Sequence, residues 1–194
     1  MLKRAFDELT VDRGETINIL GMTVQMNRER KRAVINQKHF LDNLISTYGV
    51  ITNAITPATL DLMYVPENSK LLDDQRKVMS LNTTLMYASK RTYPEISFAV
   101  VHWSSRYNKR LRRTTTPRLW KLQRTWWGVV TNTGFFIPQI STSRTVAKSN
   151  TSYTDHVDGK SHTGGCVGFE SDNASWFMWL STKQPVVALC NGMG

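Results

Sequence analysis

The chain contains little cysteine and no long apolar run, and each shortage excludes a class of protein. Cys166 and Cys190 are the only cysteines, and they lack both the CxxC spacing of a zinc site and the density of a disulfide scaffold. The charged start, MLKRAFDELTVDRGE, has no apolar stretch typical of a signal peptide, and no window of about 18 apolar residues could cross a bilayer. We therefore expect an intracellular protein, cytoplasmic or nuclear, with no membrane partner.

Acidic residues are scarce relative to basic ones. The 194 residues include 25 Lys and Arg against 15 Asp and Glu, a formal net charge of +10. Such a surplus favours phosphate-rich partners, although the same charge would equally keep any soluble protein dispersed. Because hydrophobic residues make up 40% of the chain, it can build the core of one large or two small domains.

The first part of the chain predicts a β-hairpin followed by a helix. The string TINILGMTV over 16–24 is apolar and β-branched, the charged turn NRERKR follows, and a second apolar run surrounds Val34. From Gln37 to Tyr48, apolar residues recur at the four-residue spacing of one helical face, and Gly49 follows as a stop.

The middle of the chain predicts an extended connection and then helices. Residues 51–79 contain two prolines and the mixed-charge string LLDDQRK without sustained periodicity. Ser80 is then placed to cap a helix, and Thr92 with Glu95 forms the Thr-x-x-Glu pattern of a second helix start. A further helix is predicted after Pro117.

The last third changes to Thr- and Ser-rich alternation, which is typical of strands. We predict strands near 145–153, 163–169 and 174–180. Together with the hairpin and the helical middle, they indicate an α+β fold.

Six strings, in the same order, resemble the region after the polymerase active site of copia-type retrotransposon polyproteins. They are INILGMTV, INQKHFLDNLI, ITPATLDL, LMYASKRTYPEISFAV, KSNTSYTDHVDGKSHTGG and LSTKQPVVAL. The fourth departs from the family's usual Thr-Arg-Pro-Asp-Ile, with Tyr93 in the Arg place and Glu95 in the Asp place. The most specific string has Tyr153 followed by His156, Asp158 and the run KSHTGG. Because any single string recurs by chance, their order carries the resemblance.

The resemblance implies a division of the chain into four parts. Residues 1–50 would end the reverse transcriptase palm and begin a thumb-like region, and 51–79 would be the extended connection. Residues 80–134 would form a helical connection region, and 135–194 would be an incomplete RNase H-like antiparallel sheet. The parent activities are RNA-directed DNA synthesis and hydrolysis of the RNA strand of RNA–DNA hybrids.

Both parent activities depend on carboxylates that hold two Mg²⁺ ions, and this chain lacks them in the expected places. The family's Tyr-x-Asp-Asp turn belongs upstream of the LGM strand and does not occur here. Asp73 and Asp74, the only adjacent Asp pair, lie in a charged connector without flanking apolar strands, which favours a solvated turn. The family's first RNase H Asp falls at Asn150, and its Glu falls at Met193, which does not bind a hard cation. We expect a degenerate chain with no activity of its own and no bound cofactor.

Other polar residues near KSHTGG have simpler interpretations than catalysis. We expect Asp155 and Asp158 to be solvated loop residues after the first strand. His156 and His162 lack a cysteine or an acidic partner at ligand spacing, so loop histidines are favoured over a zinc site or a general base. Lys160 resembles a basic residue that the family keeps in this loop, where it could touch a phosphate.

Basic residues in the helical middle are the best candidates for binding RNA, DNA or an RNA–DNA hybrid. The tryptophans of the helix after Pro117 are favoured as core rather than as a stacking platform, because Trp120 and Trp127 fall near one helical face. The candidate nucleic-acid-binding residues are Lys109, Arg110, Arg112, Arg113, Lys121, Arg124 and Lys160.

The sequence is compatible with three functions. The chain could be an enzyme remnant, a retained nucleic-acid-binding protein, or an interaction module that captures the rest of an element polyprotein through an exposed sheet edge. A three-stranded antiparallel sheet with nothing packed on one side would expose an apolar face and an edge. This predicts poor solubility or reliance on a partner.

Overall fold

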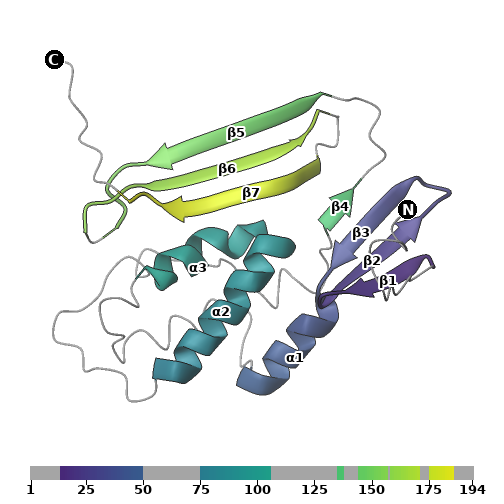
Figure 1. Ribbon diagram of the computed structural model, residues 1–194, viewed down its shortest axis with the longest axis horizontal. Coiled ribbons are helices and arrows are strands. Elements are labelled where there is room, and N and C mark those ends of the chain that lie inside the picture. Colours follow the sequence, from purple (N-terminus) through teal and green to yellow (C-terminus); the bar gives the residue numbers. More distant parts are fainter. Residues whose placement is uncertain are drawn as a thin grey trace, which may run out of the picture.

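The structure is a computed structural model that, in the part of the chain it describes, combines two antiparallel sheets with three α-helices (Figure 1). The three-stranded sheet lies across α2 and α3, and the four-stranded sheet lies beside α1. The predicted α+β class is confirmed. None of the helices in the described part of the chain has the length and apolar composition needed to cross a bilayer. The structure describes residues 14–49, 75–105, 135–137, 144–156, 158–170 and 175–185.

The four-stranded sheet has the order β1-β2-β3-β4. The single strand predicted over 16–24 is wrong, because the chain reverses at Leu20 and Gly21, whose φ angles are 50° and 73°. Positive φ at both central residues is the geometry of a two-residue hairpin turn, which glycine adopts without strain. The predicted hairpin after it is confirmed, with β2 and β3 paired. The strands are β1 (Thr16–Ile19), β2 (Met22–Asn27), β3 (Arg32–Asn36) and β4 (Phe135–Ile137).

Helix α1 (Lys38–Tyr48) confirms the prediction made from its apolar spacing. Its buried face carries Leu41 and Leu44. Gly49 ends the helix at a φ of 74°, and its N–H donates to the carbonyl of Ile45. The sequence signal and the observed stop therefore have the same cause, a left-handed residue after the last turn.

Helix α2 (Gln75–Arg91) begins earlier than predicted. The extended connection therefore does not reach residue 79, and Ser80 lies inside the helix rather than at its start. Val78 explains the difference, because it is buried on the same stripe as Leu81 and Leu85 and extends the apolar face by a turn. The remainder of the predicted connection, residues 51–74, lies outside the described part of the chain.

The predicted second helix is present as a short 3-10 turn, η3 (Pro94–Ile96), followed by α3 (Ser97–Ser104). The predicted capping by Thr92 is wrong. The Thr92 hydroxyl instead donates to Oε1 of Gln37 at 2.6 Å, which links the segment between α2 and η3 to the residue before α1. Tertiary contact between helices has replaced a local cap.

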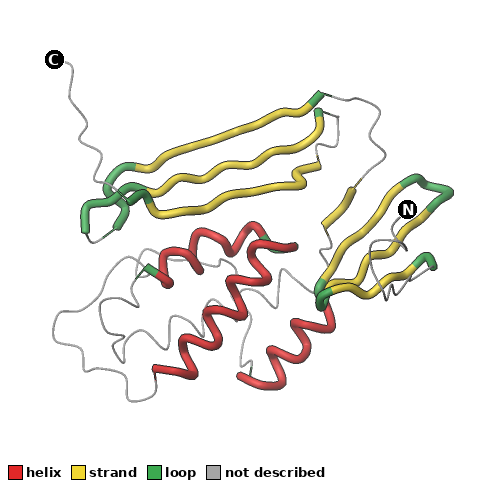
Figure 2. The backbone as a smooth tube through the Cα atoms, in the orientation of Figure 1, coloured by secondary structure: helices red, strands yellow, loops and turns green. Residues whose placement is uncertain are grey.

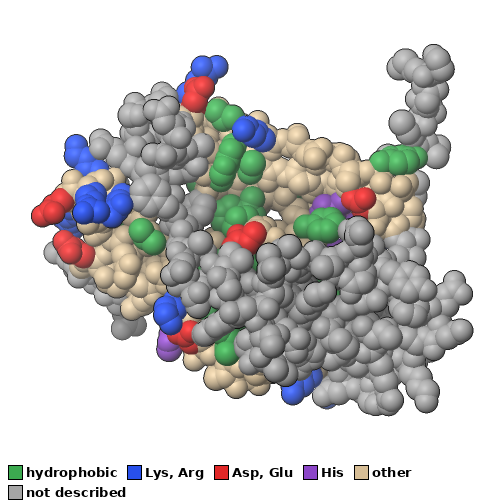
Figure 3. Space-filling model, turned by 180° about the vertical axis from the view of Figure 1, so that it is seen from behind, with side chains coloured by type: hydrophobic (Ala, Val, Ile, Leu, Met, Phe, Trp, Pro, Cys, Tyr) green, Lys and Arg blue, Asp and Glu red, His purple; other side chains and the backbone are tan. Residues whose placement is uncertain are grey.

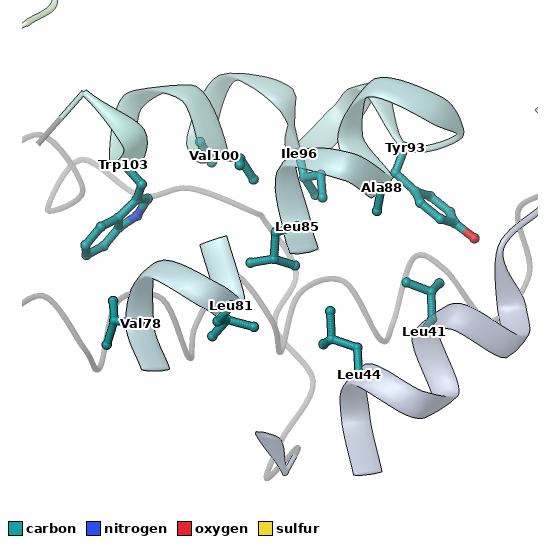
Figure 4. Close-up of a cluster of buried hydrophobic side chains, with 11 residues drawn as sticks. Leu41, Leu44, Val78, Leu81, Leu85, Ala88, Tyr93, Ile96, Val100 and Trp103 are labelled. Carbon is teal, nitrogen blue, oxygen red and sulfur yellow. The ribbon is translucent and has the colours of Figure 1, made fainter. Parts of the chain in front are cut away.

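The three helices share one apolar core (Figure 4). Leu41 and Leu44 point from α1 toward side chains of α2 and α3. Burying each such leucine contributes roughly 1.5–3 kcal/mol. The buried members of the core are Leu41, Leu44, Val78, Leu81, Leu85, Ala88, Tyr93, Ile96, Ala99, Val100 and Trp103.

The three-stranded sheet confirms the strands predicted for the last third of the chain. Figure 2 shows β5 (Thr145–Ser152), β6 (His162–Phe169) and β7 (Ser175–Lys183) side by side along most of their length. Trp179 anchors the sheet to the helices, because its Nε1–H donates to the carbonyl of Ser89 on α2 at 2.6 Å.

The expected exposed apolar side chains of this sheet are also confirmed. Phe177, Met178 and Leu180 of β7 are 40%, 59% and 52% exposed. Seen from behind in Figure 3, hydrophobic side chains appear on the upper part of the molecule, whereas Lys, Arg, Asp and Glu gather on the side of β1 to β3. Poor solubility, which we inferred from such a surface, stays a prediction.

Candidate functional site

Most of the predicted nucleic-acid-binding residues lie outside the described part of the chain. This applies to Lys109, Arg110, Arg112, Arg113, Lys121 and Arg124, and also to Met193 and to the helix predicted after Pro117. Their roles stay predictions. Lys160 and Asn150 are described: Lys160 lies half-buried in the loop between β5 and β6, and Asn150 is an exposed residue of β5.

The strand register determines which residues of the sheet lie together. Asn150 of β5 is opposite Gly164 of β6, which is opposite Ser181 of β7. Directly opposite residues point to the same face of a sheet. The next row on that face contains His162 and Lys183. This face is the one that approaches α3, because Phe98 of α3 meets the ring of His162 with centroids 4.9 Å apart.

Two adjoining cavities lie between this face and the helices. The larger, of about 670 Å³, extends along the end of α2 and includes Lys90 and Arg91 in its wall. The smaller, of about 370 Å³, includes Lys148 and Asn150. Both are lined by Ser97, Trp179, Leu180 and Ser181, so they form one basic groove. No Asp or Glu is present among the described residues that line it.

Two of the cations that line the basic groove, Arg91 and Lys148, lie against aromatic rings. The guanidinium of Arg91 lies 5.7 Å from the centroid of the Tyr87 ring. The ammonium of Lys148 lies 5.4 Å from the centroid of the Trp176 ring. Cation–π contact restricts where these charges can go while leaving their polar atoms able to meet an anion. Sequence reasoning missed both residues, because neither belongs to a basic run.

The smaller cavity lacks the carboxylate that the resemblance would lead one to expect. The family's first metal-binding Asp falls at Asn150, which lines this cavity. The side chain at that position is the neutral amide of Asn150, and its neighbour across the strands, Gly164, has no side chain. Within the described ranges, no group of three or more His, Cys, Asp or Glu side chains could hold a metal ion. The expectation that the chain binds no metal cofactor itself stays a prediction.

The prediction that His156 and His162 are loop histidines is confirmed for His156, which lies in the loop between β5 and β6, and is wrong for His162. Neither has the exposure that is usual in a loop. Each is only 4% exposed, and His162 is the first residue of β6. The ring of His156 stacks on that of buried His102 of α3, with centroids 4.7 Å apart and planes at 20°. We call these three residues the histidine cluster. It lies where α3 packs on the sheet.

Hydrogen bonds connect the cluster to the groove. Nε2 of His156 lies 3.1 Å from Nδ1 of His162. Nε2 of His162 lies 2.8 Å from the hydroxyl oxygen of Ser181. His156, His162 and Ser181 therefore form one continuous hydrogen-bonded chain from the loop to the wall of both cavities.

The surroundings of His156 and His162 favour neutral imidazoles. Burial is the main cause that lowers the pKa of His156 to about 4, and the nearby positive charge of Lys183 lowers it further. Asp158 and Asp155 act in the opposite direction and offset only part of this effect. Burial also lowers the pKa of His162. Both rings are accordingly uncharged near neutral pH.

Asp158 is not the freely solvated loop residue that we predicted. Its carboxylate accepts a hydrogen bond from Nζ of Lys183 at 2.7 Å, and both side chains are largely covered. This contact is the main reason that the pKa of Asp158 lies below its ordinary value. Asp155 lies half-buried in the same loop.

The sequence contained one overlooked signal for the histidine cluster. The string SFAVVHWS of α3 is apolar on all sides apart from its serines and its histidine. A helix of that kind is covered by other elements, so a histidine on it must lie in an interface. What the sequence did not indicate is that the covering partners are His156 and His162.

No protein-family model, no curated protein and no solved structure matches the chain. The copia-type resemblance therefore stays a prediction that depends on the order of its motifs.

Proposed function

We propose that this chain derives from the reverse transcriptase and RNase H region of a copia-type retrotransposon polyprotein and contacts nucleic acid without catalysing synthesis or cleavage. The observation that carries the binding part is the basic groove. Its wall contains Lys90, Arg91 and Lys148 and, among the described residues, no carboxylate that would repel a phosphate. The resemblance contributes the class of partner, which is RNA, DNA or an RNA–DNA hybrid.

The chemistry of the groove suits a sugar–phosphate backbone. Its cations can replace the counterions of phosphate groups, which is the main source of affinity in binding that is independent of sequence. Hydroxyl groups of Ser97 and Ser181 also line it. Lys160 and the basic run from Lys109 to Arg113 would extend the contact under this proposal.

The absence of catalysis is proposed on chemical grounds. Cleavage of a phosphodiester by two metal ions needs several carboxylates around the reacting phosphate. Asn150 can offer one neutral oxygen to a cation but no negative charge. The second expected position, Met193, carries a thioether that does not bind Mg²⁺. Mg²⁺ belongs to the parent activity in this proposal.

A second candidate function is an interaction module that binds the rest of the element polyprotein. The observation that favours it is the sheet β5-β6-β7: among the strands that the structure describes, its outer strands β5 and β7 each pair with β6 alone. The exposed Phe177, Met178 and Leu180 add an apolar surface to β7. Open edges and exposed apolar side chains are the features that accept another strand or protein.

Binding of a labelled RNA–DNA hybrid across a salt series tests the first proposal. Replacing Lys90 and Arg91 with alanine removes two of the cations that line the groove. Each lost phosphate contact should reduce the slope of log affinity against log salt by about one, so the double variant should lose about two. The matched control replaces Arg28 and Arg30, two basic residues of the turn between β2 and β3. Equal losses in both variants would show that binding is not located in the groove.

The same samples, supplied with Mg²⁺ or Mn²⁺, test the absence of catalysis. We expect binding with the hybrid left intact. Metal-dependent cleavage that Asp155→Asn and Asp158→Asn abolish would contradict the assignment of Asn150 as the lost metal ligand. Neutral replacements of Arg110, Arg112 and Arg113 distinguish the two candidate functions, because they should weaken nucleic-acid binding and leave capture of the polyprotein unchanged.

A further inference from the structure

The hydrogen-bonded chain from His156 through His162 to Ser181 has the connectivity of a nucleophile, a base and a group that orients the base. The Ser181 hydroxyl is 2.8 Å from Nε2 of His162. The other ring nitrogen of His162 is 3.1 Å from Nε2 of His156. Both separations are within the hydrogen-bond reach that serine nucleophiles and their bases require. The proposed nucleic-acid contact includes the Ser181 hydroxyl as part of the groove wall but makes no use of the two histidines.

We propose that Ser181 is a nucleophile activated by His162, and that the site accepts acyl groups from small activated carboxylic esters. His162 is the base in this proposal. His156 is a positioning residue, because it acts through His162 and not on the substrate. The proposal is independent of whether the groove binds nucleic acid.

The position of Ser181 gives a substrate access to the hydroxyl. Ser181 is half-buried on β7 and lines both cavities, of about 670 and 370 Å³, whereas His162 behind it is almost completely covered. An ester in either cavity would meet the Ser181 hydroxyl, and Nε2 of His162 lies directly behind that hydroxyl, at 2.8 Å. Lys90 and Arg91 line the larger cavity, where positive charge favours the oxyanion of a tetrahedral intermediate.

Of the two possible proton arrangements in the hydrogen-bonded chain, one activates Ser181. His162 must carry its proton on Nδ1 and donate it to Nε2 of His156, which leaves Nε2 of His162 free to accept from the hydroxyl. In the opposite arrangement, His156 donates to His162 and His162 donates to Ser181. It satisfies the same distances, but Nε2 of His162 then carries a proton and cannot act as a base. The two arrangements are distinguishable by experiment.

The reaction conserves atoms and charge. The Ser181 oxygen attacks the carbonyl carbon while its proton passes to Nε2 of His162. The bond to the leaving oxygen then breaks, and the alcohol departs with that proton, leaving an ester on Ser181. Water, deprotonated by His162, attacks this ester and releases the carboxylic acid and the free serine.

The environment of the cluster makes the base available over a wide pH range. The groups that face it are His102 from α3, Lys183 from β7, and Asp155 and Asp158 from the loop between β5 and β6. Burial lowers the pKa of His162 below its ordinary value, which favours the neutral ring that can act as a base. Reaction should therefore persist to a lower pH than for a solvent-exposed histidine base.

The first test is labelling of the full chain with a fluorophosphonate probe, followed by peptide mass mapping. We expect one adduct, on Ser181, and a loss of roughly 100-fold or more in labelling rate for Ser181→Ala and His162→Gln, as expected for loss of the nucleophile or a general base. Ser46→Ala, which changes a serine of α1, should label like the unaltered chain. Labelling spread over several serines, or equal rates in Ser181→Ala and the unaltered chain, would overturn the proposal.

Two further measurements separate a positioning role from a merely structural one. His156→Gln keeps an acceptor for Nδ1 of His162 and should retain most labelling, whereas the labelling rate of His156→Leu should fall about 100-fold at equal folded fraction.

Nitrogen NMR of the unaltered protein measures which ring nitrogen of His162 carries the proton, and it does not depend on the folding of any variant. A proton on Nδ1 of His162 is the expected result, and a proton on Nε2 would refute the proposal. Because hybrid binding is measured separately, failure here leaves the proposed function unaffected.

Discussion

Acid should loosen the packing of α3 on the three-stranded sheet, because His156 and His162 are held there in their neutral forms. The pKa of His156 is lowered from an ordinary value of 6.5 to about 4, chiefly by burial. The unfolded chain therefore takes up a proton that the folded chain resists. The stabilising contribution of the neutral ring is complete above pH 6.5 and is lost as the pH falls toward 4.

The size of the effect follows from that difference in pKa. A tenfold change in proton affinity is worth about 1.4 kcal/mol, so the full loss for His156 is about 3 kcal/mol and the loss between pH 7 and pH 5 is about 2 kcal/mol. His162 acts in the same direction, because its pKa is also lowered by burial. Asp158 acts in a separate range: its pKa is lowered from 3.8, so its contribution is lost only at lower pH.

Urea unfolding at pH 7, 6 and 5, followed by tryptophan fluorescence, measures this directly. The free energy of unfolding of His156→Gln should fall less between pH 7 and pH 5 than that of the unaltered chain, by about 2 kcal/mol. His39→Gln, at an exposed position of α1, is the matched control for loss of a histidine and should behave like the unaltered chain. Identical pH dependence in His156→Gln and the unaltered chain would show that the pKa of His156 does not differ between the folded and unfolded states.

Three further predictions concern the packing that positions the site, each measured as a free energy of unfolding. Leu85→Ala should cost about 2–5 kcal/mol, because Leu85 is 1% exposed in the helical core; a cost below 1 kcal/mol would contradict its placement. Gly21→Ala should destabilise by about 1 kcal/mol, since φ at Gly21 is 73°, and a stabilising effect would show that the β1–β2 turn has another geometry. Trp179→Phe should cost about 1–3 kcal/mol and leave the pH dependence intact, because it removes the hydrogen bond to Ser89 but no titrating group; an unchanged stability would argue against this anchor.

The groove and the hydrogen-bonded chain share Ser181 but depend on different chemistry. Binding of a phosphate backbone needs only the positive charge of Lys90, Arg91 and Lys148, and salt should weaken it. Activation of Ser181 needs a particular proton arrangement in His162 and His156, which salt should not change. The two proposals therefore respond to different perturbations, and each can fail alone.

The sequence alone determined the local elements whose signals are periodic. Apolar spacing predicted α1, and Gly49 predicted its end, because both depend on the geometry of a single helix. Alternation likewise predicted β5, β6 and β7, since side chains of a strand point to opposite faces in turn. The order of motifs led to the expectation of Asn150 in place of a carboxylate.

Tertiary structure decided the rest, because it depends on which surfaces meet. Val78 extends α2 only because it is buried in the core that the helices share. The Thr92 hydroxyl does not cap a helix but donates to Gln37, the residue before α1. His156 and His162 are surface residues by any local measure, yet α3 covers them and places His102 on the ring of His156. Packing of distant segments thereby removes water from these rings and lowers their pKa values, an effect that no local sequence pattern can encode.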